Sequence, residues 1–180
     1  VVTPWNASRL AELVGLLSAL PLAGIGFMHA NFTTAGMAAA HNAAHGGTYP
    51  ATESNLGPLD PSAYDLPGLA DEVARVRALR PPFPVSFSPQ IDGLDALRRF
   101  YLAPETRWGR LCNDAARSLM VKSDGRVIPA HGRCYDVTVG NLRESRLADV
   151  WNSPEMARFR RTLAGAGGPM PACTRCCSAF

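Results

Sequence analysis

The distribution of cysteines constrains this chain more than any other feature. The sequence holds five cysteines, and every one of them lies after residue 111: Cys112, Cys134, Cys173, Cys176 and Cys177. Thiols that gather at one end of a chain and finish in a C-x-x-C pair are typical of a site for a metal ion or an iron–sulfur cluster. We therefore expect the last third of the chain to form a module of its own.

The spacing leaves several interpretations of these thiols open. Cys112, Cys134, Cys173 and Cys176 supply four thiolates, which suit either tetrahedral Zn²⁺ or a [4Fe–4S] cluster. A disulfide framework fits less well, because the cysteine count is odd and the C-x-x-C-C run suits a reducing compartment. Buried thiols without a ligand are the remaining interpretation. Cys177 does not easily share the face used by Cys176, so we predict a spare thiol, an alternative ligand or a packed side chain.

Composition excludes some classes of partner. The chain has 180 residues, of which 47% are hydrophobic and 18% charged, and its net charge of +3 is too small to indicate a nucleic-acid partner. The uncharged run over residues 13–28 is too short for a membrane span, and Pro21 and several glycines interrupt it. No signal-peptide pattern is present. We predict a cytoplasmic protein without nucleic-acid or membrane partners.

The first 105 residues alternate between strand-like and helix-like segments. Short apolar runs indicate strands at 1–2, 22–30 and 83–87, and apolar residues at helical spacing indicate helices at 10–20, 66–80 and 93–102. This alternation predicts an α/β fold with parallel strands and right-handed crossovers. Three such units cannot close a barrel. We interpret them as the second half of a six- or eight-unit barrel, and the chain as the C-terminal part of a longer protein.

A different pattern follows, so we place a domain boundary between residues 105 and 106. Residues 118–128 indicate a β-hairpin with Asp124-Gly125 in the turn, and residues 149–151 and 154–163 indicate short helices. The C-terminal module is therefore expected to be a small α+β unit.

Several short motifs in this module occur in a recognisable order. Residues 122–129 are Lys-Ser-Asp-Gly-Arg-Val-Ile-Pro, and they are followed by Cys134, by Val-Gly-Asn-Leu at 139–142, by Leu-Ala-Asp-Val-Trp-Asn-Ser at 147–153 and by the closing C-x-x-C. This order resembles the SPASM/twitch module at the C-terminus of radical SAM enzymes, over residues 112–177. The upstream segments resemble the second half of a radical SAM partial barrel.

The sequence departs from that pattern at two places. Ala130 stands where the module usually has a cysteine, and Cys134 comes four residues later. The further cysteines of a full SPASM module do not follow the C-x-x-C pair. One auxiliary cluster, as in a twitch module, is what the resemblance then implies.

The resemblance implies a ligand set and a chemistry. Cys112, Cys134, Cys173 and Cys176 would hold the auxiliary [4Fe–4S] cluster, with Cys177 as an alternative ligand. The complete enzyme would use S-adenosyl-L-methionine, a second [4Fe–4S] cluster and a reductant such as ferredoxin or flavodoxin to modify a peptide or a small molecule by radical chemistry. The C-x-x-x-C-x-x-C motif that binds the SAM cluster is absent from this sequence, so we expect the 180-residue chain alone to be inactive.

Polar residues after the predicted strands are candidates for a second site. His29 and Asn31 follow the strand that ends near Met28, where barrel enzymes place their chemistry, so we predict that they face SAM or substrate. The alternative is a hydrogen-bonded pair at a strand end. His41 and His45 would share a helix face, but no third ligand accompanies them, which favours a lid or an exposed loop over a metal site.

Two other functions compete with the radical SAM interpretation. The module could be a zinc-ribbon-like structural or interaction unit, or a small redox protein whose C-x-x-C cycles as a dithiol. Catalytic residues are not assigned by the sequence.

Overall fold

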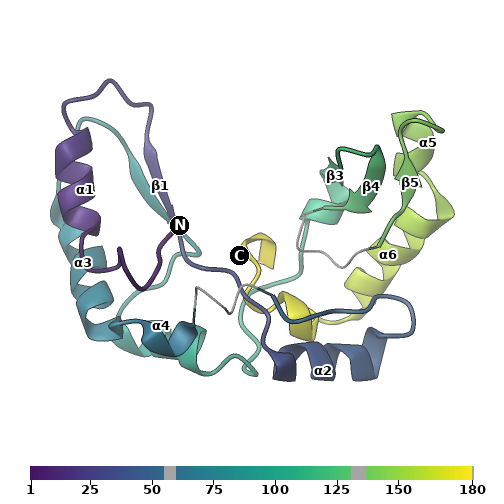
Figure 1. Cartoon of the computed structure of the whole chain (residues 1–180), viewed down its shortest axis with the longest axis horizontal. Coiled ribbons are helices and arrows are strands. Elements are labelled where there is room, and N and C mark those ends of the chain that lie inside the picture. The colour runs from purple at the N-terminus through teal and green to yellow at the C-terminus, as the bar shows by residue number, and fades with distance from the viewer. Residues whose placement is uncertain (55–59, 131–136, 180) are drawn as a thin grey trace. The chain divides into compact units, whose positions relative to one another are not determined.

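The structure is a computed structural model that describes residues 1–54, 60–130 and 137–179 (Figure 1). Its contacts divide the chain into two compact units, residues 1–32 with 55–106 and residues 33–54 with 107–180. Residues 33–54 group with the C-terminal segment because helix α2 (Ala35–His45) packs on the 3-10 turn at Pro171–Cys173. The sequence-based boundary between residues 105 and 106 assigned residues 33–54 to the first unit instead.

The first unit contains two parallel strands and their helices. Its elements in chain order are α1 (Leu10–Leu17), β1 (Ile25–Met28), a 3-10 turn (Pro61–Ala63), α3 (Leu66–Ala78), β2 (Val85–Ser88) and α4 (Leu94–Leu102). β1 and β2 pair in parallel, in register from Ile25 with Val85 to Met28 with Ser88. Parallel pairing of these two predicted strands is thus confirmed.

The strand expected at Val1-Val2 is not formed. Val2 is fully buried and its N–H donates to the Met28 carbonyl at 2.7 Å, which leaves a single backbone bond beside β1. The chain turns immediately afterwards, since the Ala7 N–H donates to the Thr3 carbonyl at 3.0 Å. Two residues before a turn are too few for a ladder.

Helices α1 and α3 pack side by side, next to the strands (Figure 1). Leu10 and Val14 of α1 and Leu69 and Val73 of α3 are buried. The buried carboxylate of Glu72 accepts a hydrogen bond at 2.9 Å from the Ala11 N–H in the first turn of α1. This bond satisfies one of the backbone donors that a helix start leaves open, so α3 caps α1.

The second unit contains a small antiparallel sheet and several helices and turns. After α2 come a 3-10 turn (Asp114–Ala116), β3 (Leu119–Val121), β4 (Arg126–Pro129), β5 (Gly140–Asn141), α5 (Leu147–Trp151), α6 (Pro154–Gly165) and the 3-10 turns Pro171–Cys173 and Cys177–Ala179. The strand order is β3-β4-β5. The predicted hairpin is confirmed: the Gly125 N–H donates to the Lys122 carbonyl at 2.9 Å, and Gly125 has a φ of 87° that favours glycine.

Two apolar clusters are found among the described residues of this unit. One lies under the hairpin and contains Val127, Val139, Val150 and Met156. The other gathers Tyr49, Ala51, Ala115, Ala130, Phe159, Leu163 and Met170. We call the second one the turn cluster, because the turn that carries Cys173 packs against it. None of the helices within the described ranges is long and apolar enough to cross a membrane.

Candidate metal centre

The C-terminal thiols are carried by two successive tight turns. Cys173 ends one 3-10 turn and Cys177 begins the next. The Cys176 N–H donates to the Cys173 carbonyl at 3.0 Å, and the Ala179 N–H donates to the Cys176 carbonyl at 3.1 Å. The side chains of Cys112, Cys173, Cys176 and Cys177 are all half-buried. Backbone bonds of this span fold the C-x-x-C segment back on itself, as a shared ligand site requires.

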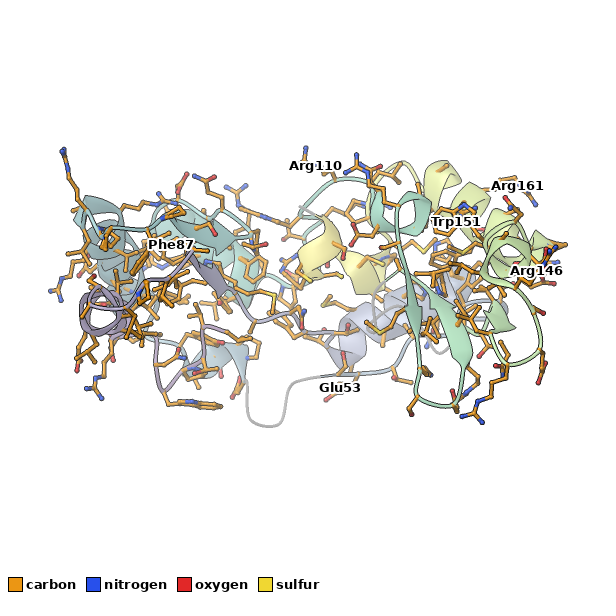
Figure 2. All side chains as sticks on the ribbon, turned by 90° about the horizontal axis from the view of Figure 1, so that it is seen from above. Glu53, Phe87, Arg110, Arg146, Trp151 and Arg161 are labelled. Carbon is orange, nitrogen blue, oxygen red and sulfur yellow. The ribbon has the colours of Figure 1, made fainter. Side chains whose placement is uncertain are left out.

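The segment that leads to Cys112 runs beside this turn. Arg110 lies on this segment (Figure 2). Its N–H donates to the Ala179 carbonyl at 2.6 Å. Gly109 permits the approach: its φ is 92°, and a Cβ there would lie 2.5 Å from the Ala179 oxygen. Spacing alone could not have predicted that the first and the last cysteine segments meet.

Arg160 of α6 fixes the chain just after Cys112. Its Nε donates to the Ala115 carbonyl at 2.8 Å and its Nη1 donates to the Trp151 carbonyl at 3.0 Å. The guanidinium also lies over the Trp151 ring, 4.2 Å from the centroid. Ala115 is itself buried in the turn cluster, so the Cys112 segment is anchored at both of its ends.

Cys134 lies outside the described residues, but its flanks do not. Ala130 is buried in the turn cluster, and Val137 and Cys173 pack against the same cluster. Ala130 has a φ of 56°, so a left-handed residue follows β4 at the position where the resemblance expects a cysteine. The described chain on each side of Cys134 therefore reaches the cluster that carries Cys173.

A buried arginine lies between the two cysteines of the closing pair. Arg175 is fully buried, and its Nη1 donates to the Thr174 carbonyl at 2.9 Å. The guanidinium keeps its charge under all ordinary conditions.

The residues present suit an iron–sulfur cluster in the chemistry of their donors. Four cysteines offer the sulfur donors that such clusters use, and the three candidate thiols within the described ranges are half-buried on hydrogen-bonded segments. Among the described residues no three His, Cys, Asp or Glu side chains are grouped as ligands of one metal ion. The proposed ligand set includes Cys134, which lies outside those residues. That all four thiols meet at one site therefore stays a prediction.

The predicted strand-end residues lie inside the first unit. His29 is buried, with Nδ1 2.9 Å from the Tyr101 hydroxyl, and its ring contacts that of Phe100. Burial lowers the pKa of His29 to about 4, so the imidazole is neutral at pH 7. Asn31 is also buried. A role toward SAM or substrate for either residue stays a prediction.

His41 and His45 share one face of α2, as their spacing predicts. Their ring centroids are 5.1 Å apart. His41 is fully buried with Nε2 2.8 Å from the Tyr49 carbonyl, and burial lowers its pKa. The bond links α2 to Tyr49 of the turn cluster. The exposed loop that the sequence offered for this stretch is therefore wrong, because His41 is fully buried within a helix.

A comparison with protein families identifies what the C-terminal module is similar to. Residues 112–177 match the family model of SPASM, an iron-sulfur cluster-binding domain. The match spans less than half of the chain and contains all five cysteines. It covers the residues over which the motif order resembled such a module, and it implies iron–sulfur cluster binding. No curated protein and no solved structure matches the chain.

Proposed function

We propose that the chain is the C-terminal part of a radical SAM enzyme and that its SPASM module holds one auxiliary [4Fe–4S] cluster. The observation that carries the proposal is the SPASM match over residues 112–177, which contains the thiol-bearing turns. Cys112, Cys134, Cys173 and Cys176 are the proposed ligands, and Cys177 is the alternative ligand. When bound, the cluster would supply electron transfer or a binding point for substrate.

Other residues of this chain would position the cysteine segments that bind the cluster. Gly109 and Arg160 hold the Cys112 segment beside the closing turn, and Arg175 supplies a fixed positive charge there. We propose that the buried guanidinium of Arg175 stabilises the loaded site, because the cluster and its thiolates carry a net negative charge.

The first unit would belong to the partial barrel that binds SAM. Support comes from the parallel β1–β2 pair and from helices α3 and α4 that follow the predicted pattern. His29 and Asn31 come directly after β1, at the carboxyl edge of the pair, and would face SAM or substrate. A second [4Fe–4S] cluster, a peptide or small-molecule substrate, a ferredoxin or flavodoxin reductant and a cytoplasmic location complete the proposal.

The proposal is tested by anaerobic reconstitution of the chain with iron and sulfide. We expect about four irons per chain and a broad absorbance near roughly 400 nm, as one thiolate-held [4Fe–4S] cluster requires. A colourless chain with one zinc ion would favour the zinc-ribbon function and contradict the cluster.

Single cysteine variants test the ligand set. Changing Cys112, Cys134, Cys173 or Cys176 to Ala should abolish iron retention, whereas the matched control Cys177→Ala should retain it. Iron loss in Cys177→Ala together with retention in Cys112→Ala would overturn the assignment. Iron and sulfide analysis of each purified variant measures the outcome.

A further inference from the structure

The outer side of β2 is an open strand edge. Among the described residues, β1 is the one strand joined to it. The Ile25 N–H donates to the Pro84 carbonyl at 3.0 Å, and the His29 N–H donates to the Ser88 carbonyl at 2.8 Å. These bonds fix which residues of this segment face β1.

The alternate residues of β2 present their backbone to the other side. In a parallel strand both backbone groups of a residue point to one side, and successive residues alternate. Because Pro84 and Ser88 face β1, Ser86 does so too, and the N–H and C=O groups of Val85 and Phe87 point outward. Unpaired groups of this kind form a template on which another extended chain can pair.

A cavity of about 450 Å³ lies along this edge. Val85, Ser86 and Phe87 all line it, although successive side chains of a strand point to opposite faces. A cavity that all three residues reach lies beside the strand rather than over one face. Its described lining includes no residue of β1, so it lies on the outer side.

The cavity has a positive rim. Arg77 and Arg80 line it, and no acidic residue does so among the described residues. Arg77 forms an ion pair with Asp92 and lies 5.9 Å from the centroid of the Phe87 ring. Arg80 is exposed and forms no ion pair within the described part of the chain. It is therefore available to a carboxylate that approaches the edge.

We propose that the β2 edge binds an extended, acidic peptide segment as an added strand. The backbone of that segment would pair with Val85 and Phe87, and its carboxylates would lie against Arg80 and Arg77. A small anion would meet the arginines but would leave the outward backbone groups without partners. Pro89 is the next residue of the strand to face outward after Phe87, and it lacks an N–H group, so the paired stretch is short. The site goes beyond the proposed function, because it lies in the first unit and uses no cluster ligand.

Amide exchange of the full 180-residue chain, measured by NMR, tests the pairing directly. The probe is an acetylated peptide of alternating Glu and Val, with a Lys/Val peptide as the charge control. At saturation the Val85 and Phe87 amides should exchange at least about tenfold more slowly, while those of Ser86 and Ser88, already directed at β1, should be unchanged. The Lys/Val peptide should give no protection.

Two variants and a matched control distinguish peptide binding at the β2 edge from a general attraction between opposite charges. Val85→Pro removes an outward N–H without touching the bonds to β1 and should weaken binding at least about tenfold. Arg80→Glu should weaken it at least about fivefold at low salt. Arg98→Glu makes the same charge change on α4, outside the cavity lining, and should weaken binding less than about twofold. Fluorescence anisotropy of the labelled peptide measures all three.

Three results would overturn the proposal. The first is equal binding of the Glu/Val peptide to Arg80→Glu and Arg98→Glu. The second is equal binding of the Lys/Val peptide. The third is protection of Val85 and Phe87 that rises with chain concentration in the absence of peptide, which would mean that a second copy occupies the edge. Should Val85→Pro fail to fold by circular dichroism, the exchange pattern and the arginine variants decide.

Discussion

The first unit is organised around joined aromatic side chains, whereas the second is organised around turns that carry thiols. In the first, Phe27 stacks on Phe87 with centroids 5.2 Å apart, and Tyr101 contacts Phe100 at 5.0 Å and Tyr64 at 4.3 Å. These residues come from β1, β2, α4 and the turn before α3. Side chains far apart in the sequence therefore pack against one another within this unit.

The second unit is built differently. Its described apolar residues are divided between the turn cluster and the cluster under the hairpin, each of a few buried side chains. The C-x-x-C turn rests on the edge of the turn cluster through Cys173. Small modules with limited cores commonly depend on a metal for stability. We therefore expect the two units to respond differently to loss of metal.

Omitting iron from the chain should produce the largest difference between the units. Because the turns that carry Cys173 and Cys176 lose their cross-link, we expect the second unit to open while the first stays folded. Hydrogen exchange measured by mass spectrometry should show lost protection in β3–β4 and α6, and unchanged protection in α3 and α4. Equal protection of α6 with and without iron would remove the contrast between the units.

Truncating one core residue in each unit should separate their stabilities. Phe159 is buried in the turn cluster, with its ring centroid 5.2 Å from that of Tyr49, so Phe159→Ala should cost about 3–5 kcal/mol in the second unit. The matched variant Leu69→Ala should cost about 2–5 kcal/mol in the first unit. Urea unfolding of the iron-loaded chain, followed by exchange in each unit, measures both. A loss shared by both units after either substitution would show that they unfold together.

The sequence predicted the parts of each unit that depend on periodic side chains or on turn residues. Helices α3 and α4, the β1–β2 pairing and the Asp124-Gly125 hairpin follow from such local signals. The pattern could not place residues 33–54 in the second unit. That assignment depends on long-range contacts, such as the bridge between Thr33 and Ser54 and the packing of α2 on the closing turn.

The same limit applies to the candidate site. Cysteine order and the flanking motifs predicted the residues that a family comparison then matched. The bond from Arg110 to Ala179 and the burial of Arg175 could not be predicted, because neither leaves a periodic or spacing signal. The ligand roles themselves stay predictions.

Acid should weaken the first unit through His29. Burial lowers the pKa of His29 from 6.5 to about 4. Between about pH 4 and pH 6.5 the imidazole is therefore protonated in the unfolded chain and neutral in the folded unit. Stability therefore falls as the pH drops from about 6.5 to about 4, by up to about 3 kcal/mol, and does not change above that window. His29→Gln can keep a hydrogen bond to Tyr101 without titrating.

Exchange of the α3 and α4 amides between pH 4 and 7 measures the effect, with His29→Gln as the control. The measurement uses only amides of the first unit, because burial also lowers the pKa of His41 in the second unit. An identical pH dependence in the parent chain and in His29→Gln would show that His29 is not the titrating group.

Substitution of Gly109 should have the smallest effect on stability. It tests whether the contact between the Cys112 segment and the closing turn holds the second unit together. A Cβ at this position would lie 2.5 Å from the Ala179 carbonyl oxygen on a backbone with φ of 92°, so Gly109→Ala must push the Cys112 segment away from the closing turn. We expect a loss of about 2 kcal/mol in the iron-loaded second unit, and a faster release of iron to a chelator. Gly15→Ala is the matched control: Gly15 lies inside α1, and a methyl group added there would meet no atom within 4 Å, so the first unit should gain about 0.5–1 kcal/mol. If Gly109→Ala released iron no faster than Gly15→Ala, the backbone contact between the first and last cysteine segments would not be what holds the ligands together.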